Sequence, residues 1–158
     1  MGSFLKVLRI FLQNVSYKIL RINKETAEHY LWGNNCHGWH LVKQAELSVI
    51  HEIMPPGTLE VRHYHQRTHQ FFFILSGKAT LEIDGSRQVL SQHEGVEVPA
   101  NIPHQMVNES DCDLEFLVIS QPPSHGDRIL SDIIESSPSS VKVFAHDSLS
   151  RVYPRYPD

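Results

Sequence analysis

The sequence predicts an all-β fold, and three observations support that prediction. From Leu47 onward, short stretches of alternating apolar and polar residues follow one another, which is the period-two pattern of half-buried strands. Turn sequences separate these stretches, among them Met54-Pro55-Pro56-Gly57 and the hairpin dipeptide Asp84-Gly85. No stretch between Leu47 and Gln121 has a convincing helical period. Many short strands with frequent turns favour a jelly roll or a β-sandwich.

The expected strands lie at 47–53, 59–65, 70–75, 78–83, 87–90, 95–98, 104–107 and 114–120. Side chains alternate across a strand, so His63 and His65 share one face with Leu59 and Val61, which makes that face the expected interior. After Pro122 and Pro123 the pattern changes, and residues 127–135 are expected to form a short helix.

Length and composition limit the partners and the domain count. A chain of 158 residues with 41% apolar residues fits one domain with a real core. We expect a single domain over 1–158, with a barrel core at 47–121, an N-terminal arm at 1–46 and a tail at 122–158. The formal charge of −4 does not provide the excess of positive charge that nucleic-acid binding needs.

The first twenty residues are apolar but interrupted by Lys6, Arg9 and Lys18. No cleavage site follows, so we expect neither a signal peptide nor a membrane span. The segment is expected to be an extra strand or an amphipathic stretch that packs on the barrel or on a second subunit; spurious upstream coding sequence is the alternative. The two cysteines, Cys36 and Cys112, form no disulfide framework and are expected to be thiols of a cytoplasmic protein.

Histidine is concentrated in the middle of the chain: nine of eleven histidines fall between His29 and His104. Two imidazoles on the interior face of one strand are costly unless their nitrogens are satisfied. His63 and His65 are therefore either a hydrogen-bonded core pair or a pair of metal ligands.

Two longer patterns bear on that choice. Residues Gly57-x5-His63-x-His65-x4-Gln70-x6-Gly77 resemble the first motif of the cupin superfamily, and Pro99-x-Asn101-x2-His104-x3-Asn108 resemble the second. The resemblance implies a cupin double-stranded β-helix, a jelly-roll barrel, here with extra N-terminal strands and a short C-terminal helix. It also implies a homodimer and one divalent transition metal, Fe, Ni, Zn or Mn, held by His63, His65, Gln70 and His104.

Gln70 departs from the cupin pattern, which usually has glutamate there. An amide oxygen still binds a cation but adds no negative charge, so a bound metal keeps more of its charge and is a better Lewis acid. His69 should face away from Gln70, although a register shift of one residue would exchange the two. Asn101 stands where glycine is usual, which asparagine tolerates because it also enters the left-handed region.

A second group of candidate residues lies before or within the first expected strand of the barrel core, 47–53. Trp32, Trp39 and His40 belong to a nine-residue stretch rich in aromatic residues, histidine and glycine. This stretch either lines the mouth of the barrel as part of a ligand pocket, or closes the barrel end or a dimer seam. His51 is a candidate acid or base if it faces the cavity.

These observations favour a metal-dependent enzyme, an isomerase, lyase or dioxygenase that acts on a small oxygenated metabolite bound to the metal. The alternative is a non-catalytic module that binds or senses a small molecule in the same pocket, because one scaffold hosts many chemistries.

Overall fold

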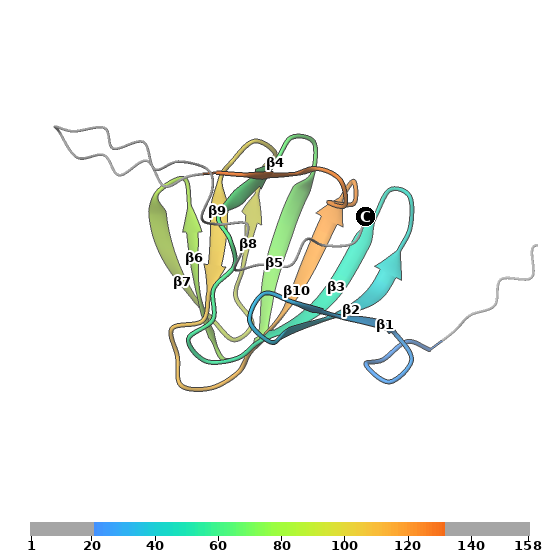
Figure 1. The fold of residues 1–158 in the computed structure, drawn as a ribbon, viewed down its shortest axis with the longest axis horizontal. Coiled ribbons are helices and arrows are strands. Elements are labelled where there is room, and N and C mark those ends of the chain that lie inside the picture. Colours follow the sequence, from blue (N-terminus) through green and yellow to red (C-terminus); the bar gives the residue numbers. More distant parts are fainter. Residues whose placement is uncertain (1–20, 132–158) are drawn as a thin grey trace, which may run out of the picture.

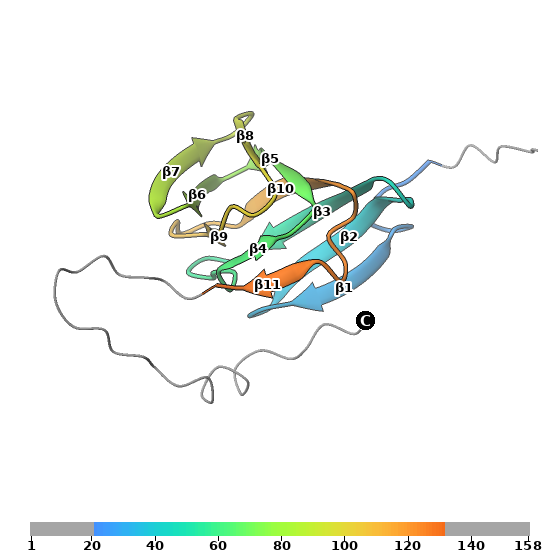
Figure 2. The same cartoon turned by 90° about the horizontal axis from the view of Figure 1, so that it is seen from above.

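The computed structural model describes residues 21–131 of the chain, which form two β-sheets that lie face to face (Figures 1 and 2). The first sheet has the strand order β1-β2-β3-β10-β5-β8 and the second β11-β4-β9-β6-β7. The first sheet contains β1 (Glu28–Trp32), β2 (Cys36–Lys43), β3 (Ser48–Met54), β10 (Leu114–Gln121), β5 (His69–Ser76) and β8 (Gly95–Val98). The second contains β11 (Arg128–Leu130), β4 (His63–His65), β9 (His104–Val107), β6 (Lys78–Ile83) and β7 (Ser86–Ser91). The all-β jelly roll expected from the sequence is confirmed.

The core lies between the sheets and follows from the alternation of apolar residues. In β10 every second side chain is buried, beginning with Leu114 and Phe116. These residues pack with Ile74 of β5 and with Leu81 and Met106 of the second sheet in one cluster. All five side chains have no exposed surface, and burial of this kind is the main stabilising contribution to such a fold.

The expected turn residues adopt the backbone angles that their positions require. Gly57 and Gly77 have φ of 70° and 84°, and Asp84 and Gly85 of the hairpin between β6 and β7 have φ of 49° and 82°. A side chain at Gly77 would also come within 2.7 Å of the backbone oxygen of Asp113, so this turn needs glycine for space as well. Asn101 adopts φ of 65°, as expected for asparagine in place of glycine.

The expected C-terminal helix is not supported. Residues Arg128–Leu130 form β11, which pairs antiparallel with β4, and the remainder of the expected helix lies outside the described residues. An isolated helix of this length gains little, whereas the edge of β4 offers backbone groups that a neighbouring strand satisfies.

The expected strand 59–65 is shorter than its pattern suggests. Leu59 makes an isolated bridge to Val107, and regular pairing begins only at His63. The irregular backbone between these points breaks the two-residue period. Leu59 is consequently 44% exposed and does not share the interior face with His63 and His65.

Two strands precede the expected barrel core. The hairpin of β1 and β2 extends the first sheet beyond β3, which agrees with the expectation of extra N-terminal strands. The segment 1–20, for which a strand or amphipathic stretch is expected, lies outside the described residues. Within 21–131 no helix has the length and apolar character needed to cross a membrane.

Candidate metal centre

The three histidines of the two sequence motifs meet between the sheets. His63 and His65 project from the same face of β4, because one residue separates them, and both are buried. His104 begins β9 and is paired directly with His63. The ligand nitrogens of the three rings lie within 4.8 Å of one another. Local strand geometry and one cross-strand pairing therefore assemble the cluster.

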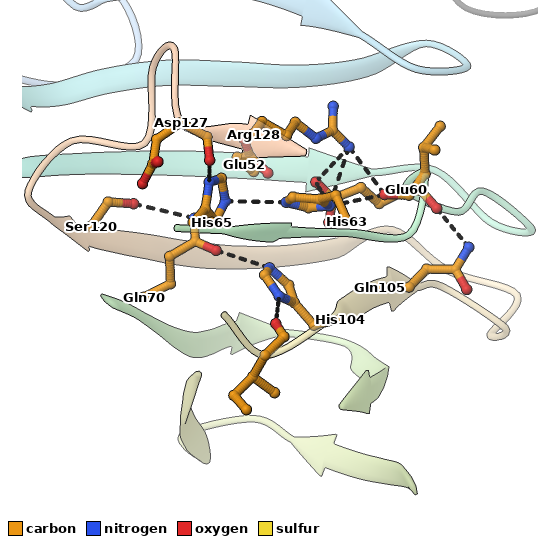
Figure 3. Close-up of polar contacts among 12 residues, drawn as sticks. Glu52, Glu60, His63, His65, Gln70, His104, Gln105, Ser120, Asp127 and Arg128 are labelled. Atoms are coloured by element: carbon orange, nitrogen blue, oxygen red, sulfur yellow. Dashed lines mark hydrogen bonds and ion pairs between the residues drawn. The ribbon is translucent and has the colours of Figure 1, made fainter. Parts of the chain in front are cut away.

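Each imidazole has its Nδ1 atom fixed by a backbone carbonyl. The distances are 2.9 Å from His63 to Val61 O, 3.1 Å from His65 to Asp127 O and 3.0 Å from His104 to Ile102 O. A carbonyl oxygen only accepts hydrogen bonds, so we infer that each Nδ1 carries the proton and that each Nε2 presents its lone pair to the centre. This is the tautomer that a metal ligand requires. Figure 3 shows the three rings and their contacts.

Gln70 brings a fourth acceptor from the opposite sheet. It lies on β5, is buried, and directs its Oε1 atom to within 2.9 Å of His104 Nε2. Its Nε2 group donates to Ser120 Oγ at 3.3 Å, which orients the amide so that the oxygen points inward. The neighbouring His69 is exposed, so the register shift that would exchange the two residues is absent.

None of the four inward atoms, the Nε2 atoms of the three histidines and Oε1 of Gln70, carries a hydrogen that it could donate. The Nε2 atoms of His63 and His65 are 3.2 Å apart, and with both Nδ1 atoms protonated their lone pairs face each other. His104 Nε2 and Gln70 Oε1 are likewise two acceptors in contact. Converging lone pairs repel unless a cation lies among them. The residues present therefore fit a divalent cation bound by three imidazoles and one amide oxygen.

Burial keeps His63 and His65 neutral. It lowers the pKa of His63 to about 3, aided by the nearby positive charge of Arg128. Burial also lowers the pKa of His65. His63 and His65 are thus neutral at neutral pH, as metal ligation by an imidazole nitrogen needs.

Asp127 supports the centre in two ways. Its backbone oxygen accepts from His65, while its buried carboxylate accepts from the backbone amides of Gln66, Arg67 and Thr68 at 3.2, 2.9 and 2.9 Å. Thr68 Oγ1 donates to the same carboxylate. Although burial raises the pKa of Asp127, these hydrogen bonds hold it below its usual value. The loop between β4 and β5 is thereby tied to the strand that supports His65.

A group of charged side chains borders His63. Arg128 Nη2 donates to Val61 O at 3.1 Å, the same carbonyl that fixes His63, and lies 3.4 Å from Glu60 Oε1. Glu60 Oε1 is in turn 3.7 Å from His63 Nδ1. Figure 3 also labels Glu52, on whose carboxyl group the charges of Glu60 and Arg128 act. The sequence analysis did not single out Glu52, Glu60 or Asp127. For Glu52 a signal was available, because it lies two residues from both Ile50 and Met54 and so shares their face of β3.

The other candidates do not gather at the centre. His51 lies on the opposite face of β3 from Ile50 and Glu52, beside Trp39 of β2, and bonds to Glu115 at 2.9 Å. His51 therefore does not face the cavity, which was the condition for its role as an acid or base. Trp39 shares this outer face, whereas Trp32 and His40 are buried on the inner side, so the three expected pocket residues are not one group.

Comparison with known proteins agrees with this geometry. The cupin domain family matches residues 50–120, the part of the chain that carries all four inward ligands. The resemblance to cupins expected from the sequence is confirmed over these residues. An uncharacterized protein of Methanocaldococcus jannaschii is 26% identical to it over 89 residues, which are 56% of this chain and 71% of that protein.

Solved cupin structures share the fold at low sequence identity. A sugar phosphate isomerase of the cupin superfamily from Silicibacter pomeroyi superposes with a TM-score of 0.59 at 20% identity, covering 66% of this chain and 76% of that one. A predicted oxalate decarboxylase from Thermotoga maritima gives a TM-score of 0.59 at 16% identity, covering 66% of this chain and all (100%) of the other. These similarities show that the chain has the cupin fold.

Proposed function

We propose that this cupin binds one divalent transition metal through His63, His65, His104 and Gln70, and that it is an enzyme acting on a small oxygenated metabolite that coordinates the metal. The observation that carries the proposal is the convergence of four acceptor atoms, three of them fixed as lone-pair donors by backbone carbonyls.

The charge of the site favours Lewis-acid chemistry. Three neutral imidazoles and a neutral amide place no negative charge on the cation, so it retains its full charge toward a substrate oxygen. A bound metal of this kind polarises a carbonyl, carboxylate or hydroxyl group. The protein's part is to hold the ligands: Ser120 orients the amide of Gln70, and Asp127 and Val61 orient His65 and His63.

The superposed structures support this class of chemistry. One is described as a sugar phosphate isomerase and the other as a predicted oxalate decarboxylase, and both reactions concern small, oxygen-rich molecules. Isomerase or lyase activity is accordingly our first choice. Imidazole ligands also accept iron, and iron in the site would instead favour a dioxygenase.

The test is a substrate screen on the metal-loaded chain. We expect turnover of sugar phosphates or of hydroxy and keto acids, followed by proton NMR, or oxygen uptake if the metal is iron. His104→Ala should abolish both metal binding and turnover, whereas His69→Ala, which removes an exposed imidazole, should preserve them. Tight retention of a ligand without product would instead establish the non-catalytic binding module.

We also propose that the chain is a cytoplasmic homodimer. The strand β1 is an edge of the first sheet and exposes 63% of Leu31, and apolar sheet edges are commonly covered by a second subunit. Light scattering of the full chain tests this: a mass of twice 18.1 kDa supports the dimer, and a mass of 18.1 kDa contradicts it.

A further inference from the structure

The segment before β4 exchanges the places that a regular strand would give to two residues. Leu59 is 44% exposed, whereas only 19% of the Glu60 side chain is exposed. In a regular strand, Glu60 and His63 would lie on opposite faces, because an odd number of residues separates their positions. The irregular backbone between the bridge at Leu59 and the start of β4 brings them together instead. Exposing a leucine and burying a carboxyl group are both unfavourable, so this arrangement needs a reason.

Two hydrogen bonds to β9 fix the backbone at Glu60. Its amide donates to Met106 O at 2.9 Å, and its carbonyl oxygen accepts from Gln105 Nε2 at 2.7 Å. The carboxyl group then lies beside the ring of His63, with Oε1 at 3.7 Å from Nδ1. Since Nε2 of this ring faces the centre, the carboxyl group occupies the side of the ring that is turned away from the other ligands.

Arg128 of β11 keeps this carboxyl group ionised and in place. Its Nη2 group lies 3.4 Å from Glu60 Oε1, 3.1 Å from Val61 O and 3.3 Å from His63 Nδ1 (Figure 3). A guanidinium group is always charged, and a carboxyl group beside it favours its ionised form. A positive charge this close to His63 would by itself oppose a cation on the other side of the ring. The negative charge of Glu60 offsets that effect.

The direct ligands bring no negative charge to a metal. Imidazoles and the amide of Gln70 are neutral groups when they bind a cation. The carboxylate of Asp127 is engaged by the amides of the loop that follows His65, and it is the backbone oxygen of Asp127 that meets the ring of His65. Within the described part of the chain, Glu60 is therefore the residue whose carboxyl group is in contact with a ligand ring.

We propose that Glu60 is a positioning residue of the metal centre, that it supplies through the ring of His63 the negative charge that Gln70 does not, and that Arg128 holds its carboxylate in place. This inference rests on the proposed function. A carboxylate on the outer side of a ligating imidazole makes the imidazole a stronger ligand and stabilises the cation beyond it. The metal centre thereby gains affinity while its direct ligands stay neutral.

The main experiment measures the zinc affinity of the full chain by competition with a chelator, with variants that separate charge from shape. Glu60→Gln keeps the size of the side chain but loses its charge, and it should bind zinc about 10- to 100-fold more weakly than wild type. Glu60→Asp keeps the charge but shortens the side chain, and it should bind zinc more tightly than Glu60→Gln. The matched control is Glu97→Gln, which removes a carboxyl group 3.8 Å from Nδ1 of the exposed His69 and should change nothing.

A double variant distinguishes the charge of Glu60 from a merely structural contact. In Glu60→Gln the guanidinium of Arg128 is left without its compensating carboxylate beside His63. Adding Arg128→Gln removes that positive charge, so the double variant should regain part of the zinc affinity that Glu60→Gln loses. If the two side chains only supported the fold, the second substitution would weaken zinc binding further.

Three results would overturn the role of Glu60 and leave the metal site of wild type intact. They are zinc binding by Glu60→Gln that is as tight as in wild type, weaker binding by Glu60→Asp than by Glu60→Gln, and weaker binding by the double variant than by Glu60→Gln alone. If wild type itself retains no zinc, the proposed function fails, and the role of Glu60 fails with it.

Discussion

His65 and Asp127 are joined by a hydrogen bond between the Nδ1 atom of the histidine and the backbone oxygen of the aspartate, 3.1 Å apart. The carboxylate of the same aspartate accepts hydrogen bonds from the loop that follows His65. One residue of the C-terminal segment therefore sets both the tautomer of a ligand and the path of the chain beyond it. Stability and metal affinity are coupled at this point.

The first prediction is that Asp127→Asn destabilises the chain by about 1.5–3 kcal/mol, since the charge-assisted bonds from the loop amides are weakened. Urea unfolding measures the loss. The zinc affinity should fall as well, by about 10-fold or more, because a support of a ligand is disturbed. Asp111→Asn changes an exposed carboxylate and is the control; an equal effect of both variants would contradict the coupling.

The second prediction concerns the charge of Gln70. Gln70→Glu places a carboxylate among the three imidazoles and should tighten divalent metal binding by about 10-fold or more. Ser120 can donate its hydroxyl hydrogen to the new oxygen, so the geometry is retained. Competition with a chelator measures the affinity, and Gln92→Glu, at an exposed position, is the control. Unchanged or weaker binding in Gln70→Glu would show that Oε1 is not a ligand.

The third prediction is that Gly38→Ala costs about 1–3 kcal/mol, because the added methyl group overlaps the ring of Tyr30. The cost should shrink in a Tyr30→Ala background, where the ring is absent. A double-mutant cycle measured by chemical unfolding yields this coupling. Additive effects of the two substitutions would mean that the ring does not lie over Gly38.

The fourth prediction follows from the raised pKa of Glu52. Its value of about 8 in the folded chain exceeds the ordinary value of 4.5. The folded state therefore binds more protons between these values, and this residue's contribution to stability is lost as the pH rises from about 4.5 to about 8. Glu52→Gln has no such dependence. The variant should gain stability relative to wild type across this range; thermal midpoints at several pH values that keep a constant difference would refute it.

Much of the fold was predictable because its determinants are local. The strands Lys78–Ile83, Gly95–Val98 and His104–Val107 have the expected bounds. Alternation within each strand and turn residues at each end decide these bounds. The same local rule put His63 and His65 on one face and His69 opposite Gln70, as the structure has them.

The remainder depends on which segments meet in space. The face of His51 was ambiguous because β3 has apolar residues on both faces, Val49 and Ile53 on one and Ile50 and Met54 on the other. The contact of His65 with Asp127 joins residues 62 positions apart. No pattern within a strand predicts a contact of that range, and the same holds for the pairing of β11 with β4.

The central claim is that His63, His65, Gln70 and His104 bind a metal, and elemental analysis of the full chain tests it most directly. After incubation with zinc, nickel, manganese or iron(II) and removal of the excess, wild type and His69→Ala should retain close to one metal per chain, while His104→Ala should retain almost none. The account is contradicted if wild type retains no metal, or if His104→Ala retains as much as wild type.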